Sequence, residues 1–106
     1  MTTFAFNSKY SQESQAVLKR IGEYQDGSPA LEVYSQFGEP LSKVTVCMSS
    51  YGETPREGYV FIKDYAENEG VVQALHEAGV IGSPERWLDA GYVTKGVAEC
   101  KLLVQV

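Results

Sequence analysis

Residues 37–46, FGEPLSKVTV, join a turn signal to the most strand-like run of the chain. Gly38 tolerates the positive φ that a tight turn needs, and Pro40 suits the first position of a strand. In the run 41–48, LSKVTVCM, residues alternate between two faces and several are β-branched, which favours a strand. We therefore predict that this stretch reverses the chain and begins a strand. The turn does not need the side chain of Glu39, so a separate role for that carboxylate stays open.

Upstream of this strand, the sequence predicts two more strands of an antiparallel meander. Residues 16–25 form a mixed, strand-like run, and residues 30–35 alternate between apolar and polar side chains. Asp26-Gly27 between them supplies the positive-φ position of a tight hairpin. Residues 1–15 are polar, and we expect a loosely held arm there, although its two phenylalanines, Phe4 and Phe6, could hold a short edge strand.

Downstream of this strand, residues 49–58 have the composition of a loop and residues 59–63, YVFIK, predict a short fourth strand. A helix is then expected over residues 65–78. Asp64 is a good N-cap residue, and Glu67 completes a pattern like a capping box. The helical spacing continues through the apolar positions Val71, Leu75 and Ala78, and Gly79 is a natural residue to follow the helix end.

The rest of the chain predicts an irregular connection followed by a strand region. We expect the connection GVIGSPERWLDAG to carry at most a short helical turn after Pro84. Residues 92–106 should form one or two strands interrupted at Gly96. The predicted fold class is α+β, a single domain over residues 1–106. An antiparallel sheet, a meander of about four strands plus a C-terminal strand or hairpin, is packed by one main helix.

The composition is that of an ordinary globular protein. The chain has 106 residues, of which 43% are hydrophobic and 22% are charged, and no apolar run is long enough to span a membrane. The first residues lack the features of a signal peptide. The two cysteines, Cys47 and Cys100, lie in apolar runs, and we expect them to be reduced thiols of a cytoplasmic protein.

Negative charge is concentrated in the middle of the chain. The net charge is −5, and residues 53–89 carry eight acidic and three basic residues, so 3 − 8 = −5 and this segment accounts for the whole net charge. A surface that binds phosphates carries the opposite sign, so we do not expect direct binding to nucleic acid.

The pattern Y-x-D-G-x-x-A-L-x-V-Y-x-x-x-G-E-P-x-x-x-V-T-V, Tyr24 to Val46, resembles a family of short bacterial proteins of unknown function. Members of that family are common on conjugative elements, plasmids and prophages. The resemblance continues through GYVFIKD, GVVQALHEAGVI and the last strand region, and departs from the family at YAENE and IGSPERWLDAG. It implies no activity, cofactor or site residue, and only a setting, a mobile element in a bacterial cytoplasm.

The sequence contains no catalytic or metal-binding signature. His76 is the only histidine. It could act with Cys47 or Cys100 as nucleophile and with a carboxylate, Asp26 or Asp64, in a small hydrolase, but no local motif supports this. One histidine and two separated cysteines do not make a standard zinc site. We therefore expect a protein that is not an enzyme and uses no metal or cofactor.

The acidic middle segment is the best functional candidate, although it could equally serve solubility. As a functional surface, it would fit a basic groove on a protein that binds nucleic acid. The sequence-based hypothesis is an inhibitor of a host CRISPR effector complex or restriction enzyme. The predicted partner-binding residues are Glu53, Glu57, Asp64, Glu67, Glu69, Glu77, Tyr51 and Trp87. The alternative is a structural or regulatory accessory protein that forms a homodimer through a sheet edge.

Overall fold

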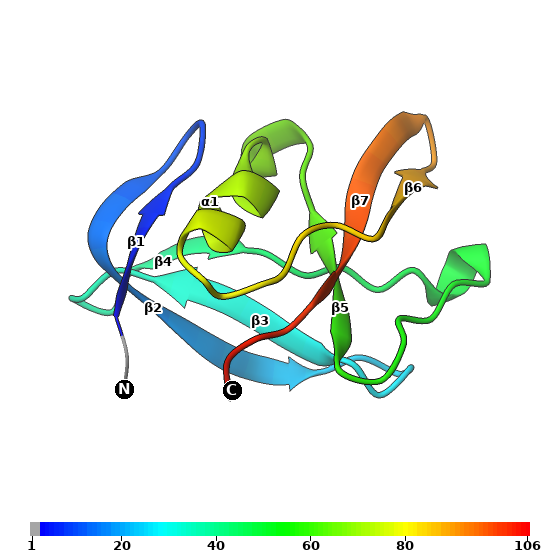
Figure 1. Cartoon of the computed structure of the whole chain (residues 1–106), viewed down its shortest axis with the longest axis horizontal. Helices are drawn as coiled ribbons and strands as arrows, with labels where there is room; N and C mark the ends of the chain where they lie inside the picture. The colour runs from blue at the N-terminus through cyan, green and yellow to red at the C-terminus, as the bar shows by residue number, and fades with distance from the viewer. Residues whose placement is uncertain (1–2) are drawn as a thin grey trace.

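A computed structural model of the chain describes residues 3–106, which form two antiparallel sheets (Figure 1). The first sheet has the strand order β1-β2-β3-β4 and the second has the order β5-β7-β6. The strands are β1 (Phe4–Asn7), β2 (Gln12–Glu23), β3 (Pro29–Tyr34), β4 (Pro40–Lys43), β5 (Tyr59–Lys63), β6 (Arg86–Ala90) and β7 (Val93–Lys101). The helical elements are the 3-10 turns η1 (Ser49–Tyr51) and η2 (Ala66–Asn68) and the helix α1 (Val71–Glu77).

The segment 44–46 connects the two sheets. On one side, the Val44 N–H donates to the Leu31 carbonyl of β3 at 3.1 Å. On the other side, the Lys63 N–H donates to the Val44 carbonyl at 2.9 Å, and Thr45 forms an antiparallel bridge with Ile62 of β5. The prediction of one regular strand over 41–48 is therefore wrong, because the regular pairing ends at Lys43 and the chain then passes from one sheet to the other.

The side chain of Thr45 stabilises this crossing. Its hydroxyl accepts a hydrogen bond of 2.9 Å from the Leu31 N–H, and the Tyr24 hydroxyl lies 3.1 Å from the same oxygen. Thr45 is buried, so without this bond the Leu31 N–H would be buried without a partner. A side-chain oxygen thus replaces a backbone acceptor at the point where the strand leaves the first sheet.

Both turns expected around β3 are present. Gly27 has φ +88° and the Asp26 carboxylate accepts a bond of 2.9 Å from the Ser28 N–H, while Gly38 has φ +86°. In the second turn, the Ser35 hydroxyl oxygen accepts hydrogen bonds from the backbone N–H groups of residues 37 and 39. The turn thus involves the backbone of Glu39, whose side chain is exposed.

The N-terminal segment is a paired edge strand and not a loose arm. Within the described part of residues 1–15, β1 pairs with β2, with Phe4 opposite Ala16 and Phe6 opposite Glu13. Phe6 is fully buried, and this burial provides the free energy that holds a short edge strand in place. The edge-strand alternative for the two phenylalanines is therefore confirmed, while Met1 and Thr2 lie outside the described residues.

The helix is shorter than predicted because a glycine separates two helical pieces. Gly70 has φ +89° and lies between η2 and the seven-residue α1. Asp64 does contact the start of α1, since its two carboxylate oxygens accept from the N–H groups of Gly70 at 2.6 Å and Val72 at 3.3 Å. Gly79 has φ +76° beyond the helix, as expected. No helix within residues 3–106 has the length and apolar character needed to cross a membrane.

The connection after the helix contains a strand that the sequence analysis missed. Residues 86–90 form β6, which pairs with β7 so that Arg86 lies opposite Glu99 and Leu88 opposite Val97. The predicted helical turn after Pro84 is therefore wrong, because pairing with β7 and packing of Leu88 favour the extended chain. β7 continues through Gly96 without interruption, so the C-terminal region is one strand within this hairpin.

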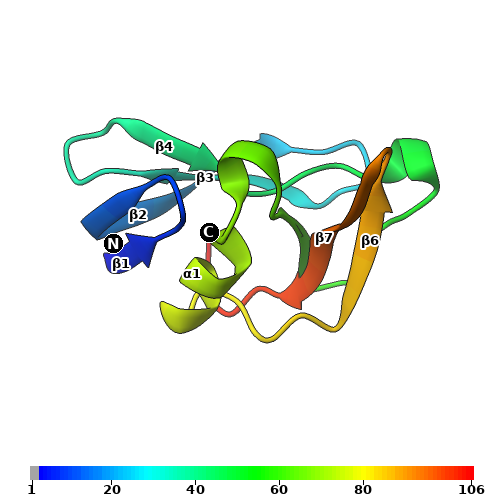
Figure 2. The same cartoon turned by 90° about the horizontal axis from the view of Figure 1, so that it is seen from above.

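The main hydrophobic cluster lies between the two sheets and is closed by α1, which contacts β1 and β5 (Figures 1 and 2). It includes Phe6, Leu31 and Val33 from the first sheet, Val60, Ile62 and Cys100 from the second, and Val71 and Leu75 from α1. A second, smaller cluster of Met48, Phe61 and Val97 lies beneath the loop that contains η1. The fold is thus an antiparallel β structure with one short helix, and the helix covers only part of it.

The hydroxyl of Thr45 can be tested by removing it with little change of shape. We expect Thr45→Val to lower the free energy of unfolding by about 1–3 kcal/mol, because the buried Leu31 N–H loses its partner. The matched control is Thr94→Val, at an exposed position of β7. Urea denaturation of both variants checks this, and equal midpoints for the two would contradict the role given to Thr45.

Candidate functional site

The structure divides the predicted partner-binding residues between two regions. Tyr51, Glu53, Glu57 and Trp87 belong to η1, the loop after it and β6, at the right-hand end of the molecule in Figure 1, which we call the η1–β6 end. Four others lie around η2 and α1: Asp64, Glu67, Glu69 and Glu77. Glu69 binds Lys9 beside β1 at 2.8 Å, so this second group extends toward the opposite end.

Most of the predicted acidic residues already have partners. Glu53 pairs with Arg86 at 3.0 Å, and Glu67 pairs with Lys63 at 2.6 Å. Glu77 accepts a bond from Gln73 at 2.8 Å, and the Asp64 carboxylate contacts the start of α1. Glu57 is the predicted acidic residue that has no side-chain hydrogen bond or ion pair within residues 3–106.

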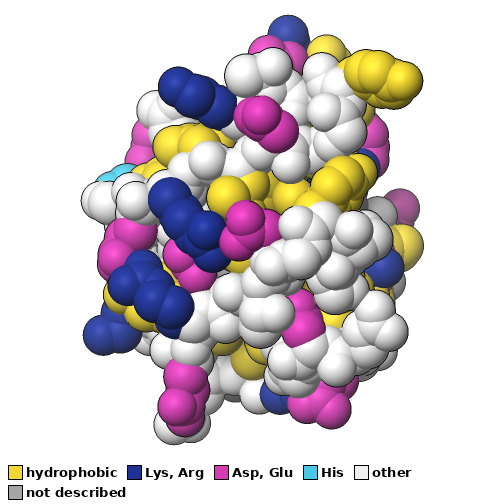
Figure 3. All heavy atoms as spheres, turned by 90° about the vertical axis from the view of Figure 1, so that its right-hand side faces the viewer, with side chains coloured by type: hydrophobic (Ala, Val, Ile, Leu, Met, Phe, Trp, Pro, Cys, Tyr) yellow, Lys and Arg dark blue, Asp and Glu magenta, His cyan; other side chains and the backbone are white. Residues whose placement is uncertain are grey.

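The η1–β6 end has mixed charge. Figure 3 looks at the right-hand side of Figure 1 and shows acidic and basic side chains interspersed, with hydrophobic side chains between them. A continuous acidic face is not formed on this side, because Arg56 pairs with Glu85 and Arg86 pairs with Glu53. This arrangement could not be seen in the charge count along the sequence.

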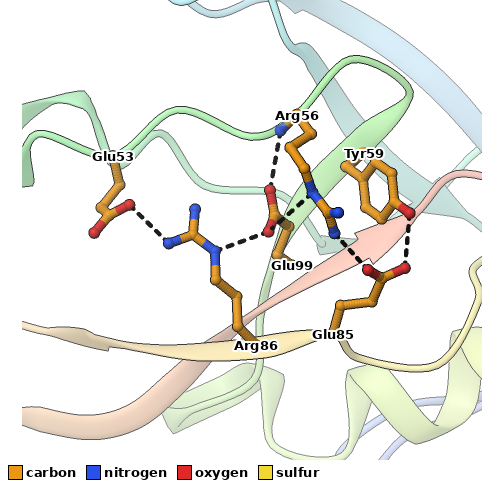
Figure 4. Close-up of polar contacts among 6 residues, drawn as sticks. All are labelled: Glu53, Arg56, Tyr59, Glu85, Arg86 and Glu99. Carbon is orange, nitrogen blue, oxygen red and sulfur yellow. Dashed lines mark hydrogen bonds and ion pairs between the residues drawn. The ribbon is translucent and has the colours of Figure 1, made fainter.

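An ion-pair network around one buried carboxylate organises the same end, and it was not predicted from the sequence. Glu99 of β7 is 1% exposed and lies at its centre (Figure 4). One of its carboxylate oxygens accepts a hydrogen bond of 2.9 Å from the Arg56 N–H, and the other accepts a hydrogen bond of 2.8 Å from Arg86 Nε. Arg86 also reaches Glu53, so the network links β7, β6 and the loop 52–58.

The second half of the network involves Glu85. Its carboxylate pairs with the Arg56 guanidinium at 2.5 Å and accepts a hydrogen bond of 2.7 Å from the Tyr59 hydroxyl. The guanidinium of Arg56 also lies 4.0 Å from the centre of the Tyr59 ring. Hydrogen bonds from Arg56 and Tyr59 lower the pKa of Glu85, which therefore stays ionised at neutral pH.

The environment of Glu99 explains how a carboxylate can be buried here. Burial by itself would raise the pKa of Glu99, but the bonds from the Arg56 N–H and from Arg86 outweigh it, and the pKa is lowered. The network therefore holds the loop 52–58 against the second sheet with charged groups rather than with apolar packing. One sequence signal pointed to it, a lone glutamate within the apolar run VAEC.

Large aromatic side chains are exposed at the η1–β6 end. Tyr51 is 54% exposed, Trp87 is 40% exposed, and Tyr92 at the β6–β7 turn is fully exposed. A Cβ on Gly91 would lie 3.4 Å from the Tyr51 hydroxyl, so η1 and the hairpin turn are in contact range. Trp87 lies on the opposite face of β6 from Leu88, which packs on the second cluster. Tyr92 was not among the predicted residues.

The hydrolase alternative finds no support in the contacts of its residues. Burial raises the pKa of the Cys100 thiol to about 12, which keeps it protonated and unreactive. The side chain of His76 contacts the Ile81 carbonyl at 3.3 Å, and that of Cys47 lies beside Ser49 and Asp26. Within the part of the chain that the structure describes, no group of three or more potential metal ligands is found.

A scan against protein-family models and searches of curated proteins and of solved structures each returned no match. The similarity to proteins of mobile elements therefore stays a prediction from the sequence. The candidate site is defined by its geometry, namely the ion-pair network around Glu99 and the exposed aromatic side chains of the same η1–β6 end.

Acid should weaken the ion-pair network. Because the pKa of Glu99 is lower in the folded protein, its stabilising effect is present above the unfolded-state pKa and is lost as the pH falls through the folded-state pKa. We expect Glu99→Gln to lower the free energy of unfolding by about 1–3 kcal/mol at pH 7, and the difference from the wild type to shrink toward pH 3.

Denaturation curves at several pH values check this, with the exposed Glu39→Gln variant as the control for loss of one carboxylate. If the difference in free energy of unfolding between the wild type and Glu99→Gln stays constant from pH 7 to pH 3, the ionised form of Glu99 does not contribute to stability.

Proposed function

We propose that this chain is a non-enzymatic protein-binding inhibitor and that the η1–β6 end is its partner-binding surface. The observation that carries the proposal is the pair of exposed aromatic side chains Tyr51 and Tyr92, where η1 meets the β6–β7 turn, together with the exposed Trp87 on the outer face of β6. Aromatic residues are enriched in protein interfaces and dominate their binding energy. A large exposed aromatic side chain is costly to leave in water unless a partner covers it.

Rigidity of the loop supports this use. The network around Glu99 fixes the loop 52–58 to β6 and β7 before any partner arrives. A surface that is already ordered loses less conformational entropy on binding, which leaves more of the contact energy for affinity. The partly exposed charged groups of the network belong to the same end and supply the polar side chains that the rim of an interface usually has.

The partner we propose is a protein with a basic groove. Glu57 and Asp89 are exposed acids of the η1–β6 end that have no ion-pair partner within the described residues, and the whole chain has a net charge of −5. The narrower proposal is a host defence system that targets nucleic acid, either a CRISPR effector complex or a restriction enzyme. The bacterial mobile-element setting implied by the sequence resemblance supports that choice.

A second candidate function is an accessory protein that acts as a homodimer. It is favoured by the outer strands β1 and β6, which each pair on one side only within their sheets. An outer strand presents unpaired backbone groups that a second copy could pair with. The homodimer can be distinguished from the inhibitor by its molecular mass in solution, which would increase with protein concentration as two copies associate.

The proposed surface can be tested by removing its aromatic side chains. The tagged chain is used to capture proteins from bacterial lysate at low and high salt, and a captured nuclease or CRISPR subunit is then purified for direct binding measurements. We expect Tyr51→Ala and Tyr92→Ala to weaken that binding by roughly 30-fold each, the value for a loss of about 2 kcal/mol.

Phe37→Ala is the matched control, since Phe37 is 81% exposed but lies in the β3–β4 turn. An equal loss in the Phe37 variant would contradict the choice of the η1–β6 end. If the tagged chain captures only further copies of itself at both salt concentrations, the inhibitor proposal is overturned and the homodimer is supported.

A further inference from the structure

A groove lies where the chain passes from the first sheet to the second, and neither the sequence analysis nor the proposed function uses it. It has a volume of about 480 Å³, which is within the range of small-molecule sites. We call it the junction groove. Its walls come from the end of β2, from β4 and the segment after it, and from the end of β5 and η2. The residues that matter most are Tyr24, Lys43, Lys63, Tyr65 and Glu67.

Two tyrosine rings of the junction groove are held in fixed positions. The Tyr24 hydroxyl donates to the Thr45 carbonyl at 3.1 Å, so the ring cannot turn away without breaking that bond. The Tyr65 ring lies against Gly96 of β7, where an added Cβ would be only 2.8 Å from the Tyr65 Cδ1 atom. A flat molecule that entered the groove would therefore find these rings already in place.

Two lysines lie over these rings. The ammonium nitrogen of Lys43 is 5.8 Å from the centre of the Tyr24 ring, and that of Lys63 is 5.0 Å from the centre of the Tyr65 ring. Lys43 has no ion-pair partner among residues 3–106. A chain with net charge −5 thus presents two cations on the walls of one groove, although Glu32 and Glu67 also border it.

The ion pair between Lys63 and Glu67 can be replaced by a pair between Lys63 and another anion. Its side chain is 24% exposed, whereas that of its partner Glu67 is 69% exposed. An exposed glutamate gains little from such a pair and can move into water, while the lysine stays against the groove. An anion arriving in the groove can therefore take the place of the Glu67 carboxylate beside Lys63.

We propose that the junction groove binds a small phosphorylated molecule with a flat ring, of the class of a mononucleotide. The phosphate would bind Lys43 and Lys63, since ammonium groups form strong charge-assisted hydrogen bonds with phosphate oxygens. The ring would stack on Tyr24, because the Tyr65 ring lies against Gly96 and beneath Lys63. Stacking on an aromatic side chain accepts any base, since every base has a flat π-face. This site goes beyond the proposed function and does not depend on it, because none of the three exposed aromatic residues of the η1–β6 end lines the groove.

The test is calorimetric titration of the full-length chain with adenosine monophosphate, with inorganic phosphate and adenosine as partial probes. We expect saturable binding of the monophosphate and weaker binding of each partial probe. Lys43→Met and Lys63→Met should each lower the affinity about tenfold or more. The matched control, Lys101→Met, removes the same charge opposite Tyr59 at the other end of β5 and should leave the affinity unchanged.

Glu67→Gln gives a result of the opposite sign. It removes the carboxylate that competes for Lys63, so affinity should rise, whereas Glu69→Gln, which removes an acid paired with Lys9 outside the groove, should have no effect. This variant remains informative if a lysine variant fails to fold. Absence of saturable binding would overturn the proposal. So would equal affinity for phosphate and monophosphate, or an equal loss in Lys101→Met.

Discussion

The fold depends on the short segment 44–46, which is hydrogen-bonded to both sheets at once. Its backbone pairs with β3 through Leu31 and with β5 through Ile62, and the Thr45 hydroxyl supplies the acceptor that the departing strand no longer offers. The two sheets therefore cannot separate without exposing buried backbone groups, and each such group costs free energy when it is left without a partner. The same segment contributes Val44 to the main hydrophobic cluster and contributes Thr45 and Val46 to the wall of the junction groove.

The η1–β6 end is organised on a different principle. There the buried carboxylate of Glu99 contacts Arg56 and Arg86, in a space that apolar side chains could also have filled. Buried ion pairs add little net stability compared with apolar packing, but they require one geometry. Glu99 accordingly fixes the position of the loop 52–58 more than it strengthens the fold. That division of roles fits a surface whose shape matters to a partner.

The local features of the fold could be predicted from the sequence, and the long-range ones could not. The turns at Asp26-Gly27 and Gly38 were predicted because their chemistry is contained in a few residues. β6 was missed because Arg86-Trp87-Leu88-Asp89 has no β-branched residue, and its strand conformation comes from pairing with β7. Whether the acidic residues share a face could not be predicted, because partners such as Lys9 for Glu69 are distant in sequence and their pairing cannot be read from spacing.

The placement of β5 has a consequence for the order in which the chain assembles. The strands of the first sheet are neighbours in sequence and can pair as they are synthesised. In contrast, β5 can pair with β7 only after the end of the chain is made, since Tyr59 lies opposite Lys101. During synthesis, residues 44–46 are available before β7 and can hold β5 along its first edge through Ile62. The finished half of the protein thus acts as a template on which the later half is completed, which shortens the time during which an apolar strand is left unpaired.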